Sequence, residues 1–299
     1  MLQANTEQNL GAFEKAGPSK RPARSSRPRN GYLLAKGLGL LVPATLLLAW
    51  SVAAAKQWVP PQILPSPASV VDTLLEQVRS GDLFVNLGIS LGRVVAGFAV
   101  GGAIGLLLGI AMGLSRTVED YLHPMFKAVS QVPVLGWLPL AMMVLGIGES
   151  LKVAIIAHAS LVPVALNALK GIRGVSRNYI EVAKVFQFSR RQLLGKVVLP
   201  AAVPSLFVGI RYGITQAWLS LVTVELLASS EGLGFMIVWG RQLFQLDLVL
   251  SAIIVVGAVG LLIDKSLELV ESRLLRWRPR VSFEAQAAGA LPSTTAGES

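Results

Sequence analysis

The residue types that carry most enzymatic chemistry are scarce in this sequence. It contains no cysteine and two histidines, His123 and His158. A thiolate nucleophile, an iron–sulfur cluster and a His-Glu-x-x-His zinc motif are therefore excluded. The phosphate-binding pattern Gly-x-x-x-x-Gly-Lys-Ser/Thr is also missing from the sequence. We accordingly expect no catalytic residue, no metal and no cofactor on this chain itself.

Three ionisable side chains lie inside apolar stretches, where a charge is costly and marks a functional position. Glu225 is expected either to gate a pathway or to lock helices together. The alternative is a carboxylate near the membrane interface that pairs or snorkels. An ionised Glu225 would repel an anion, which favours gating over direct binding. Arg211 is expected either to help an anion pass or to follow the positive-inside rule, and His158 to pack between helices.

The composition places these stretches in a membrane. Of 299 residues, 53% are hydrophobic and 15% are charged, and the mean hydropathy is +0.60, a mixture unsuited to a water-soluble domain. Six mainly apolar stretches are each about as long as the 20 residues that a helix needs to cross a bilayer. They are 32–55, 91–114, 125–147, 151–170, 203–228 and 247–270. We therefore predict an all-α polytopic membrane protein, with a disordered basic cytoplasmic arm over 1–31, a transmembrane domain over 32–270 and a cytoplasmic tail over 271–299.

The distribution of positive charge predicts the orientation. The formal net charge is +10, and six spans place both termini on the same side. If that side is cytoplasmic, all but five of the 27 lysines and arginines are cytoplasmic; the five are Lys56, Arg79, Arg93, Lys152 and Arg241. This asymmetry follows the positive-inside rule. Because the basic residues are spread over separate segments, we expect no nucleic-acid partner.

A shorter segment, 66–80, has the pattern of an amphipathic helix. Ser66 is suited to cap it and Pro67 to occupy its first turn. It is too short and too charged to cross a bilayer. It is therefore expected either to lie on the outer membrane surface or to pack on neighbouring spans.

Proline and glycine break the third span. Proline leaves backbone carbonyls without a partner, and lipid cannot satisfy them, so this region should face protein or water. We therefore expect residues 131–140 to line a pathway, with Gln131, Pro133, Trp137 and Pro139 as the candidate residues. In the second span, four glycines recur every four residues and predict close approach of another helix: Gly97, Gly101, Gly105 and Gly109.

The segment 171–202 is expected to form two short cytoplasmic helices. Ser176 is placed to cap a helix over 177–187, and its apolar stripe contains Tyr179, Val182, Ala183 and Phe186. Ser189 and Gln192 have capping-box spacing and predict a second helix over 190–197, which Leu199-Pro200 should end. On spacing alone, the pair could instead lie flat on lipid headgroups.

The same segment resembles a known motif. Glu181-Val182-Ala183, then Gln187, then Val197-Val198-Leu199-Pro200 are similar in register to the EAA loop of ABC-importer permeases, E-A-A-x-x-x-G-x(9)-I-x-L-P. Val182 and Val197 preserve the size class of the motif residues. Gln187 replaces glycine, and because a positive φ there would cost about 1 kcal/mol, the turn is expected to be rebuilt.

Further motifs extend the resemblance over nearly the whole chain after residue 60. They are Leu64-Pro65-Ser66-Pro67, Ser90-Leu91-Gly92-Arg93, Gly146-Ile147-Gly148-Glu149, and Glu225 with Ser229-Ser230-Glu231-Gly232-Leu233-Gly234. These motifs are similar to those of the nitrate/sulfonate/taurine branch of the permeases.

The resemblance implies a type I ABC-importer permease fold, with six transmembrane helices and a cytoplasmic coupling helix pair. A separate ATPase subunit, holding ATP and Mg²⁺, would dock on residues of the pair: Tyr179, Glu181, Val182, Ala183, Phe186, Gln187, Leu199 and Pro200. It also implies a bacterial inner membrane, a periplasmic substrate-binding protein and a permease homodimer in contact with lipid.

The substrate implied by the resemblance is an aliphatic sulfonate or a sulfate ester, with taurine or nitrate as alternatives.

Two other classes of protein compete with this interpretation. An ion-coupled secondary transporter should show inverted repeats, and none is evident. An intramembrane hydrolase would need a catalytic or metal constellation that two histidines do not supply.

Overall fold

The described part of this computed structural model covers residues 29–275, with side chains described from residue 41 onward, and all of its elements are helical. The chain divides into two units, Met1–Lys56 and Gln57–Ser299. The first unit contains α2 (Arg29–Ala55), which matches the predicted span 32–55. Most of the predicted arm over 1–31 lies outside the described residues.

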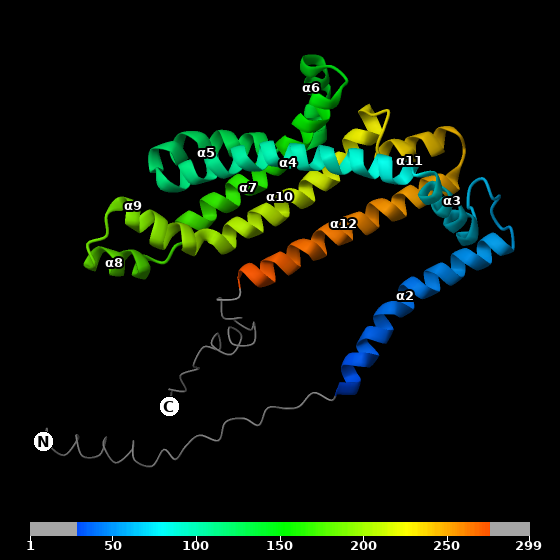
Figure 1. Cartoon of the computed structure of the whole chain (residues 1–299), viewed down its shortest axis with the longest axis horizontal. Coiled ribbons are helices and arrows are strands. Elements are labelled where there is room, and N and C mark those ends of the chain that lie inside the picture. Colours follow the sequence, from blue (N-terminus) through cyan, green and yellow to red (C-terminus); the bar gives the residue numbers. More distant parts are fainter. Residues whose placement is uncertain (1–28, 276–299) are drawn as a thin grey trace, which may run out of the picture. The chain divides into compact units, whose positions relative to one another are not determined.

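The second unit contains the remaining helices (Figure 1). They are α3 (Pro67–Ser80), α4 (Asp82–Leu114), α5 (Arg116–Ser130), η1 (Val134–Trp137), α6 (Leu138–Leu145), α7 (Glu149–Arg173), α8 (Arg177–Val185), α9 (Arg190–Leu193), the π turn η2 (Leu194–Val198), α10 (Leu199–Ala228), α11 (Leu233–Gln242) and α12 (Leu246–Leu274). Because α12 reaches Leu274, the predicted tail over 271–299 begins inside a helix, and most of it lies outside the described residues.

Four helices within residues 29–275 are long and apolar enough to cross a membrane. They contain the predicted spans 91–114, 151–170, 203–228 and 247–270. A fifth candidate is the bent pair of α5 with η1–α6. In α2, the apolar part with described side chains, Leu41–Ala55, is shorter than a full span. The predicted total of six spans therefore remains a prediction.

The glycines of α4 allow α7 to approach closely. A Cβ added to Gly105 would lie 2.5 Å from the carbonyl oxygen of Leu161, and one added to Gly97 would meet the side chain of Ile156. Gly101 and Gly109 face backbone carbonyls of α7 in the same way. The predicted role of this stripe in helix packing is confirmed, and any larger side chain there would push the two helices apart.

A hydrophobic core joins α4, α7, α10, α11 and α12. Its buried residues include Ile156, Trp218, Leu221 and Leu233. Helix α11 was not predicted from the sequence. At ten residues it is too short to register as a span, and four buried residues anchor it: Leu233, Gly234, Met236 and Gly240.

The helix predicted over 66–80 is present as α3. The Ser66 hydroxyl accepts a hydrogen bond from the Ser69 amide at 3.1 Å, and Pro67 occupies the first turn. Val70 is buried, and Thr73 Oγ1 donates to Asp247 Oδ2 of α12 at 2.6 Å. Of the two expected placements, α3 therefore packs on neighbouring helices.

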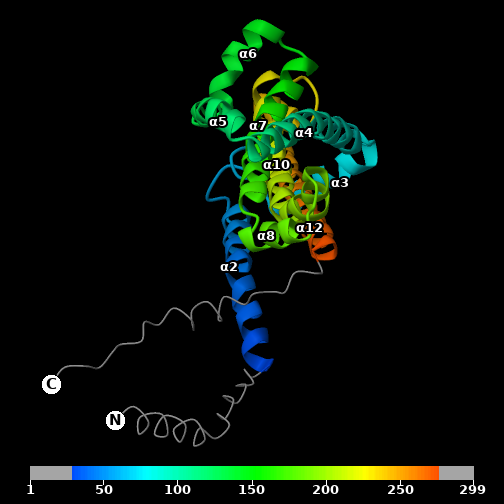
Figure 2. The ribbon, with the colours of Figure 1, turned by 90° about the vertical axis from the view of Figure 1, so that its left-hand side faces the viewer.

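The third predicted span, 125–147, is wrong in its start, whereas the predicted break inside it is confirmed. The helix begins at Arg116, ends at Ser130, and is bent by 91° relative to the segment Val134–Leu145. Figure 2, which is turned by 90° from Figure 1, shows α6 directed away from α4, α7 and α10. Pro133 lies at the break, where it can give no hydrogen bond to the preceding turn.

The expected stop at Leu199-Pro200 is also wrong, because the chain stays helical from α9 through η2 into α10. The Leu199 amide donates to the carbonyl of Leu194, which makes the wider turn of a π-helix. Pro200 has no amide hydrogen, but in the first turn of α10 it follows this widened turn without interrupting the helix.

We predict that Gly105→Ala destabilises the protein by about 1–3 kcal/mol, because the added methyl group meets the backbone of Leu161. The matched control is Gly92→Ala, at a position where a Cβ would meet nothing within 4 Å. Thermal unfolding in detergent measures both variants. Equal melting temperatures for the two would contradict the packing role of the stripe.

Candidate functional site

A cavity of about 570 Å³ lies between α7, α10 and the stretch around Pro133. Its polar lining side chains are Ser130, His158, Asn167, Lys170, Tyr212, Gln216, Ser220 and Thr223. Apolar residues such as Leu166 and Leu219 complete the wall. No aspartate or glutamate is among the lining residues.

An apolar cluster adjoins this cavity near Glu149, at the N-terminal end of α7. Leu138, Leu151 and Val224 are buried there, and Trp137 packs against them. Trp137 also contacts His158 edge to face, with ring centroids 5.7 Å apart. Its Nε1 is the one buried side-chain nitrogen or oxygen in the described residues that lacks a hydrogen-bond partner.

The four residues expected from the third span are placed differently from one another. Pro133 lines the cavity. Trp137 lies beside it through its contact with His158. Gln131 and Pro139 are exposed and are not among the lining residues. The proline break therefore marks the cavity, but α7 and α10 supply most of its polar wall.

Arg93 is the centre of a second group of polar residues. Its guanidinium donates to Glu149 at 2.8 and 2.6 Å, to Glu225 Oε1 at 2.7 Å and to the Glu231 carbonyl at 2.8 Å. Arg93 is 4% exposed and Glu225 is fully buried, whereas the side chain of Glu149 is 61% exposed. Lys152 also donates to Glu149, at 2.7 Å. Two buried cations are thus balanced by two carboxylates.

The same group holds the loop between α10 and α11. The Glu225 carboxylate accepts hydrogen bonds from the Ser90 hydroxyl and from the Gly234 amide at 2.9 Å. Asn86 accepts from the Gly232 amide at 2.8 Å. Gly232 has φ +105, and a Cβ on it would clash with the Glu225 carboxylate. The geometry is that of a lock between α4, α7, α10 and α11.

Arg211 is not directed into the cavity. It donates to Asp264 at 2.8 Å and to Glu271 at 3.0 Å, and both acceptors lie on α12. These contacts tie α10 to α12 in a partly exposed region.

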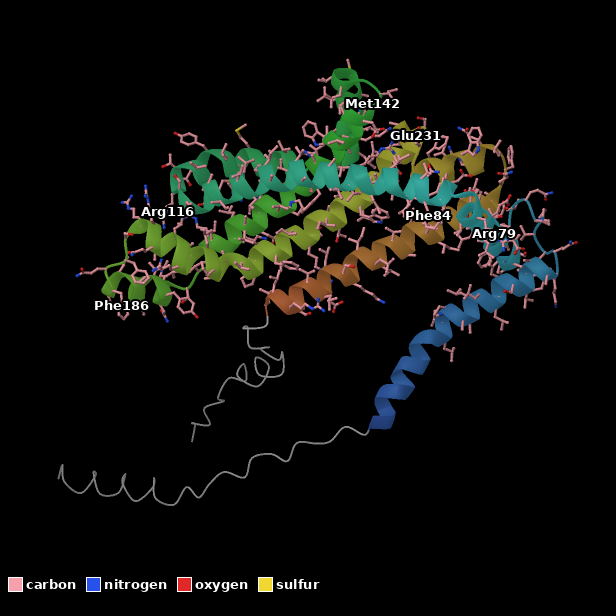
Figure 3. The ribbon with its side chains drawn as sticks, in the orientation of Figure 1. Arg79, Phe84, Arg116, Met142, Phe186 and Glu231 are labelled. Carbon is pink, nitrogen blue, oxygen red and sulfur yellow. The ribbon has the colours of Figure 1, made fainter. Side chains whose placement is uncertain are left out.

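The segment 177–202 forms the predicted helix pair at the end of the long helices opposite α3 and α11. Figure 3 shows Phe186, directly after α8, at this end, with Glu231 and Phe84 toward the other. The predicted Ser189–Gln192 capping box is confirmed in both of its hydrogen bonds. Ser176 occupies the predicted N-cap position of α8, but its side chain accepts no hydrogen bond from the helix.

The apolar stripe of α8 is mostly exposed. Tyr179, Val182 and Phe186 are 61%, 56% and 71% exposed, and Glu181 is exposed as well. Ala183 differs, since it is buried at 3% exposed. The exposed stripe borders a groove of about 430 Å³ that Pro200 also lines, while Leu199 is half-buried.

The turn after α8 keeps the shape that glycine would give it. Gln187 has φ +52, which is left-handed, so the expectation of a rebuilt turn is wrong. The Phe188 amide donates to the Ala183 carbonyl at 3.0 Å and closes the helix end. Glutamine therefore accepts the backbone strain, and the hydrogen-bonded turn is retained.

Residues 101–276 match the family described as binding-protein-dependent transport system inner membrane component. The chain belongs to this family. It is thus a permease subunit, an inner-membrane transport component and not an enzyme.

Two relatives are similar to this permease over most of its length. A candidate aliphatic sulfonates transport permease protein, SsuC of Bacillus subtilis, is 38% identical over 93% of this chain and 98% of its own. The taurine transport system permease protein TauC of Escherichia coli is 35% identical over 80% of this chain and 88% of its own.

The fold of the permease also matches a solved structure. A chain in the crystal structure of an amino acid ABC transporter with histidines has a TM-score of 0.54 and 19% identity, with 67% of this chain and 98% of that chain covered. The fold is therefore that of a type I ABC-importer permease.

We predict that Glu225→Ala destabilises the permease by about 3–5 kcal/mol, because it removes the fully buried carboxylate and leaves the buried Arg93 with Glu149, which is 61% exposed and also binds Lys152. In the double variant Arg93→Met with Glu225→Leu, the loss of stability should be smaller than the sum of the losses in the two single variants Arg93→Met and Glu225→Leu. The control is Asp264→Asn in a partly exposed pair, expected to cost less than about 1 kcal/mol. Unfolding in detergent measures all of them, and additive single losses would contradict a coupled pair.

We predict that Gln187→Gly raises the free energy of unfolding of the helix pair by about 1 kcal/mol, because glycine adopts φ +52 without strain. Gln187→Ile should lower it, since a β-branched side chain is least compatible with a positive φ. Protease susceptibility of the 177–202 segment reports the change. A more resistant Ile variant would show that the turn has another conformation.

Proposed function

We propose that this permease is the membrane-spanning subunit of an ATP-driven importer that moves a small sulfur-containing anion into the cytoplasm. The substrate class is an aliphatic sulfonate or a sulfate ester, supported by similarity to the Bacillus subtilis relative. Taurine is the alternative supported by the Escherichia coli relative, and nitrate is a further one.

The exposed apolar stripe of α8 carries the proposal. Three large apolar side chains stand in solvent at the end of the long helices, beside a groove that another protein can fill. Exposed apolar surface of this kind is typical of a protein–protein contact. Since the sequence has no phosphate-binding loop, the partner we propose is a separate ATPase subunit that binds ATP and Mg²⁺.

The residues expected at this contact divide into two roles. Tyr179, Val182 and Phe186 provide the exposed surface, with Glu181 beside them. Ala183 is buried, and its small side chain lets α8 pack closely against η2 of the same chain. Gln187 shapes the turn, and Leu199 and Pro200 connect the helix pair to α10.

The orientation we propose places the α8 end in the cytoplasm, together with both termini. Basic residues concentrate at that end: Arg116, Arg173, Arg177, Lys184, Arg190, Arg191 and Lys196. The opposite end, with α3 and α11, would then face the periplasmic substrate-binding protein. Such asymmetry follows the positive-inside rule.

A second copy of the permease completes the proposed pathway. One chain supplies one α8 and one cavity on the faces of α7 and α10, and a closed pathway needs a facing wall. A two-fold homodimer surrounded by lipid provides that wall with the same residues.

An ion-coupled secondary transporter is the less favoured alternative. Coupling ions bind to carboxylates near the middle of the membrane. Glu225, the one carboxylate inside α10, is already bound by Arg93, Ser90 and the Gly234 amide.

We predict that Val182→Asp abolishes copurification of the ATPase and lowers uptake at least tenfold, because burying an unpaired charge in an apolar contact costs about 2 kcal/mol or more. The matched control is Lys184→Gln, an equal change in charge on the polar face of α8, which should keep both activities. Normal copurification and uptake in the Val182 variant would contradict the proposed docking surface.

We predict that a strain lacking this permease fails to grow on an aliphatic sulfonate as its sole sulfur source but grows on sulfate. Reintroducing the gene should restore growth and the uptake of labelled ethanesulfonate. Separate cultures on taurine as sulfur source and on nitrate as nitrogen source test the alternatives. Unchanged growth on every sulfonate would contradict the proposed substrate class.

A further inference from the structure

Carboxylates are kept away from the cavity. Helices α7 and α10 supply most of its wall, and together they contain two acidic residues, Glu149 and Glu225. Both belong to the Arg93 lock at the α3–α11 end, and neither lines the cavity. An anion in the cavity therefore meets no fixed negative charge on this wall.

Several hydrogen-bond donors of the cavity are uncommitted. Thr223 donates back to the carbonyl of Leu219 in its own helix, whereas Ser220 has no hydrogen bond among the described residues. The ring nitrogens of His158 are likewise without a hydrogen bond within residues 41–275. Tyr212 accepts from Gln216 Nε2 at 3.1 Å, so its own hydroxyl hydrogen remains available to a ligand.

A positive charge borders the same cavity toward the α8 end. Lys170 lies in the last turn of α7 and lines the cavity. Its ammonium group forms no ion pair within the described part of the chain, whereas the neighbouring Arg173 pairs with Glu119. The cavity thus has uncharged hydrogen-bond donors along its wall and a cation, Lys170, at its α8 end.

We propose that this cavity is an oxyanion-selective binding site, in which His158, Tyr212 and Ser220 donate hydrogen bonds to a sulfonate head group. The inference rests on the proposed function and specifies the substrate class of that site. A sulfonate is a monoanion whose three oxygens only accept hydrogen bonds, which matches the available donors of His158, Tyr212 and Ser220. Leu166 and Leu219 provide apolar surface for its alkyl chain.

Uncharged donors also suit a site that must release its ligand. A direct ion pair in a partly dry cavity binds more tightly than neutral hydrogen bonds. Conduction requires binding that is strong enough for entry and weak enough for exit. The neutral donors of the cavity and the single lining cation, Lys170 at the α8 end, meet both requirements.

The same composition discriminates between sulfonates. Taurine carries an ammonium group in addition to its sulfonate, and a buried ammonium group without a carboxylate partner is costly. The site is therefore selective for simple alkanesulfonates over taurine.

The test introduces a carboxylate with the least change in shape. In Gln216→Glu, uptake of ethanesulfonate should fall about tenfold or more, because the new charge repels the anion and the carboxylate also accepts the hydroxyl hydrogen of Tyr212. Uptake of taurine should fall less, since its ammonium group pairs with the carboxylate. The taurine-to-ethanesulfonate uptake ratio should thus rise at least about threefold, while copurification of the ATPase is unchanged.

A second pair of variants guards against misfolding of the first. Ser220→Asp should reproduce the change in ratio, and the neutral Ser220→Asn, of similar size, should not. An unchanged ratio in both acidic variants that fold, with normal uptake by the wild type, overturns the inference and leaves the proposed function intact. Absence of any sulfonate uptake by the wild type would overturn the proposed function instead.

Discussion

A bilayer offers no partner to a charge or to a backbone amide, so this protein must satisfy its polar groups internally. The Arg93 lock is the clearest case. The side chains of Glu149, Glu225 and Ser229 accept hydrogen bonds from Arg93, and the buried Glu225 also accepts from Ser90 of α4 and from the Gly234 amide of α11. The close contact of α4 with α7 has a steric basis instead, because the glycines of α4 leave no side chain between the two helices and the carbonyl oxygens of α7 lie directly against them.

A few hydrogen-bond donors of the cavity have no acceptor within the described residues. Most serines and threonines of the described helices donate to carbonyls of their own helix, as Ser160, Thr215 and Thr223 do. Ser220 does not, and it lies in a cavity with His158. An anion in transit is thus the acceptor that these groups lack in the permease alone.

The sequence predicted features that depend on local spacing. The capping box at Ser189, the helix started by Ser66 and the glycine stripe of α4 are all encoded within a few residues, and the structure contains them. The identity of the family followed from the motif around Glu181. Features that depend on distant partners were not predicted. Glu225 was singled out, but Arg93 lies 132 residues earlier in the chain, and nothing local joins the two.

At two prolines, Pro133 and Pro200, the structure differs from the sequence-based prediction. Pro133 does break a helix, yet the polar wall beside it comes from α7 and α10, so the local signal indicated the cavity and missed His158 and Ser220. Pro200 was expected to stop a helix, and a π turn carries the helix past it instead. Proline tells where a regular turn fails, but the packing of neighbouring elements decides what replaces that turn.

The unbroken helix from α9 to α10 has a mechanical consequence. Roughly 60 Å of continuous helix, at 1.5 Å per residue, runs from the capping box to the Arg93 lock and contains no loop that could absorb displacement. Tilting such a rod by about 5° would swing its far end by about 5 Å. A force on α8 that tilts this helix about the Arg93 lock would therefore change the width of the cavity that α10 lines.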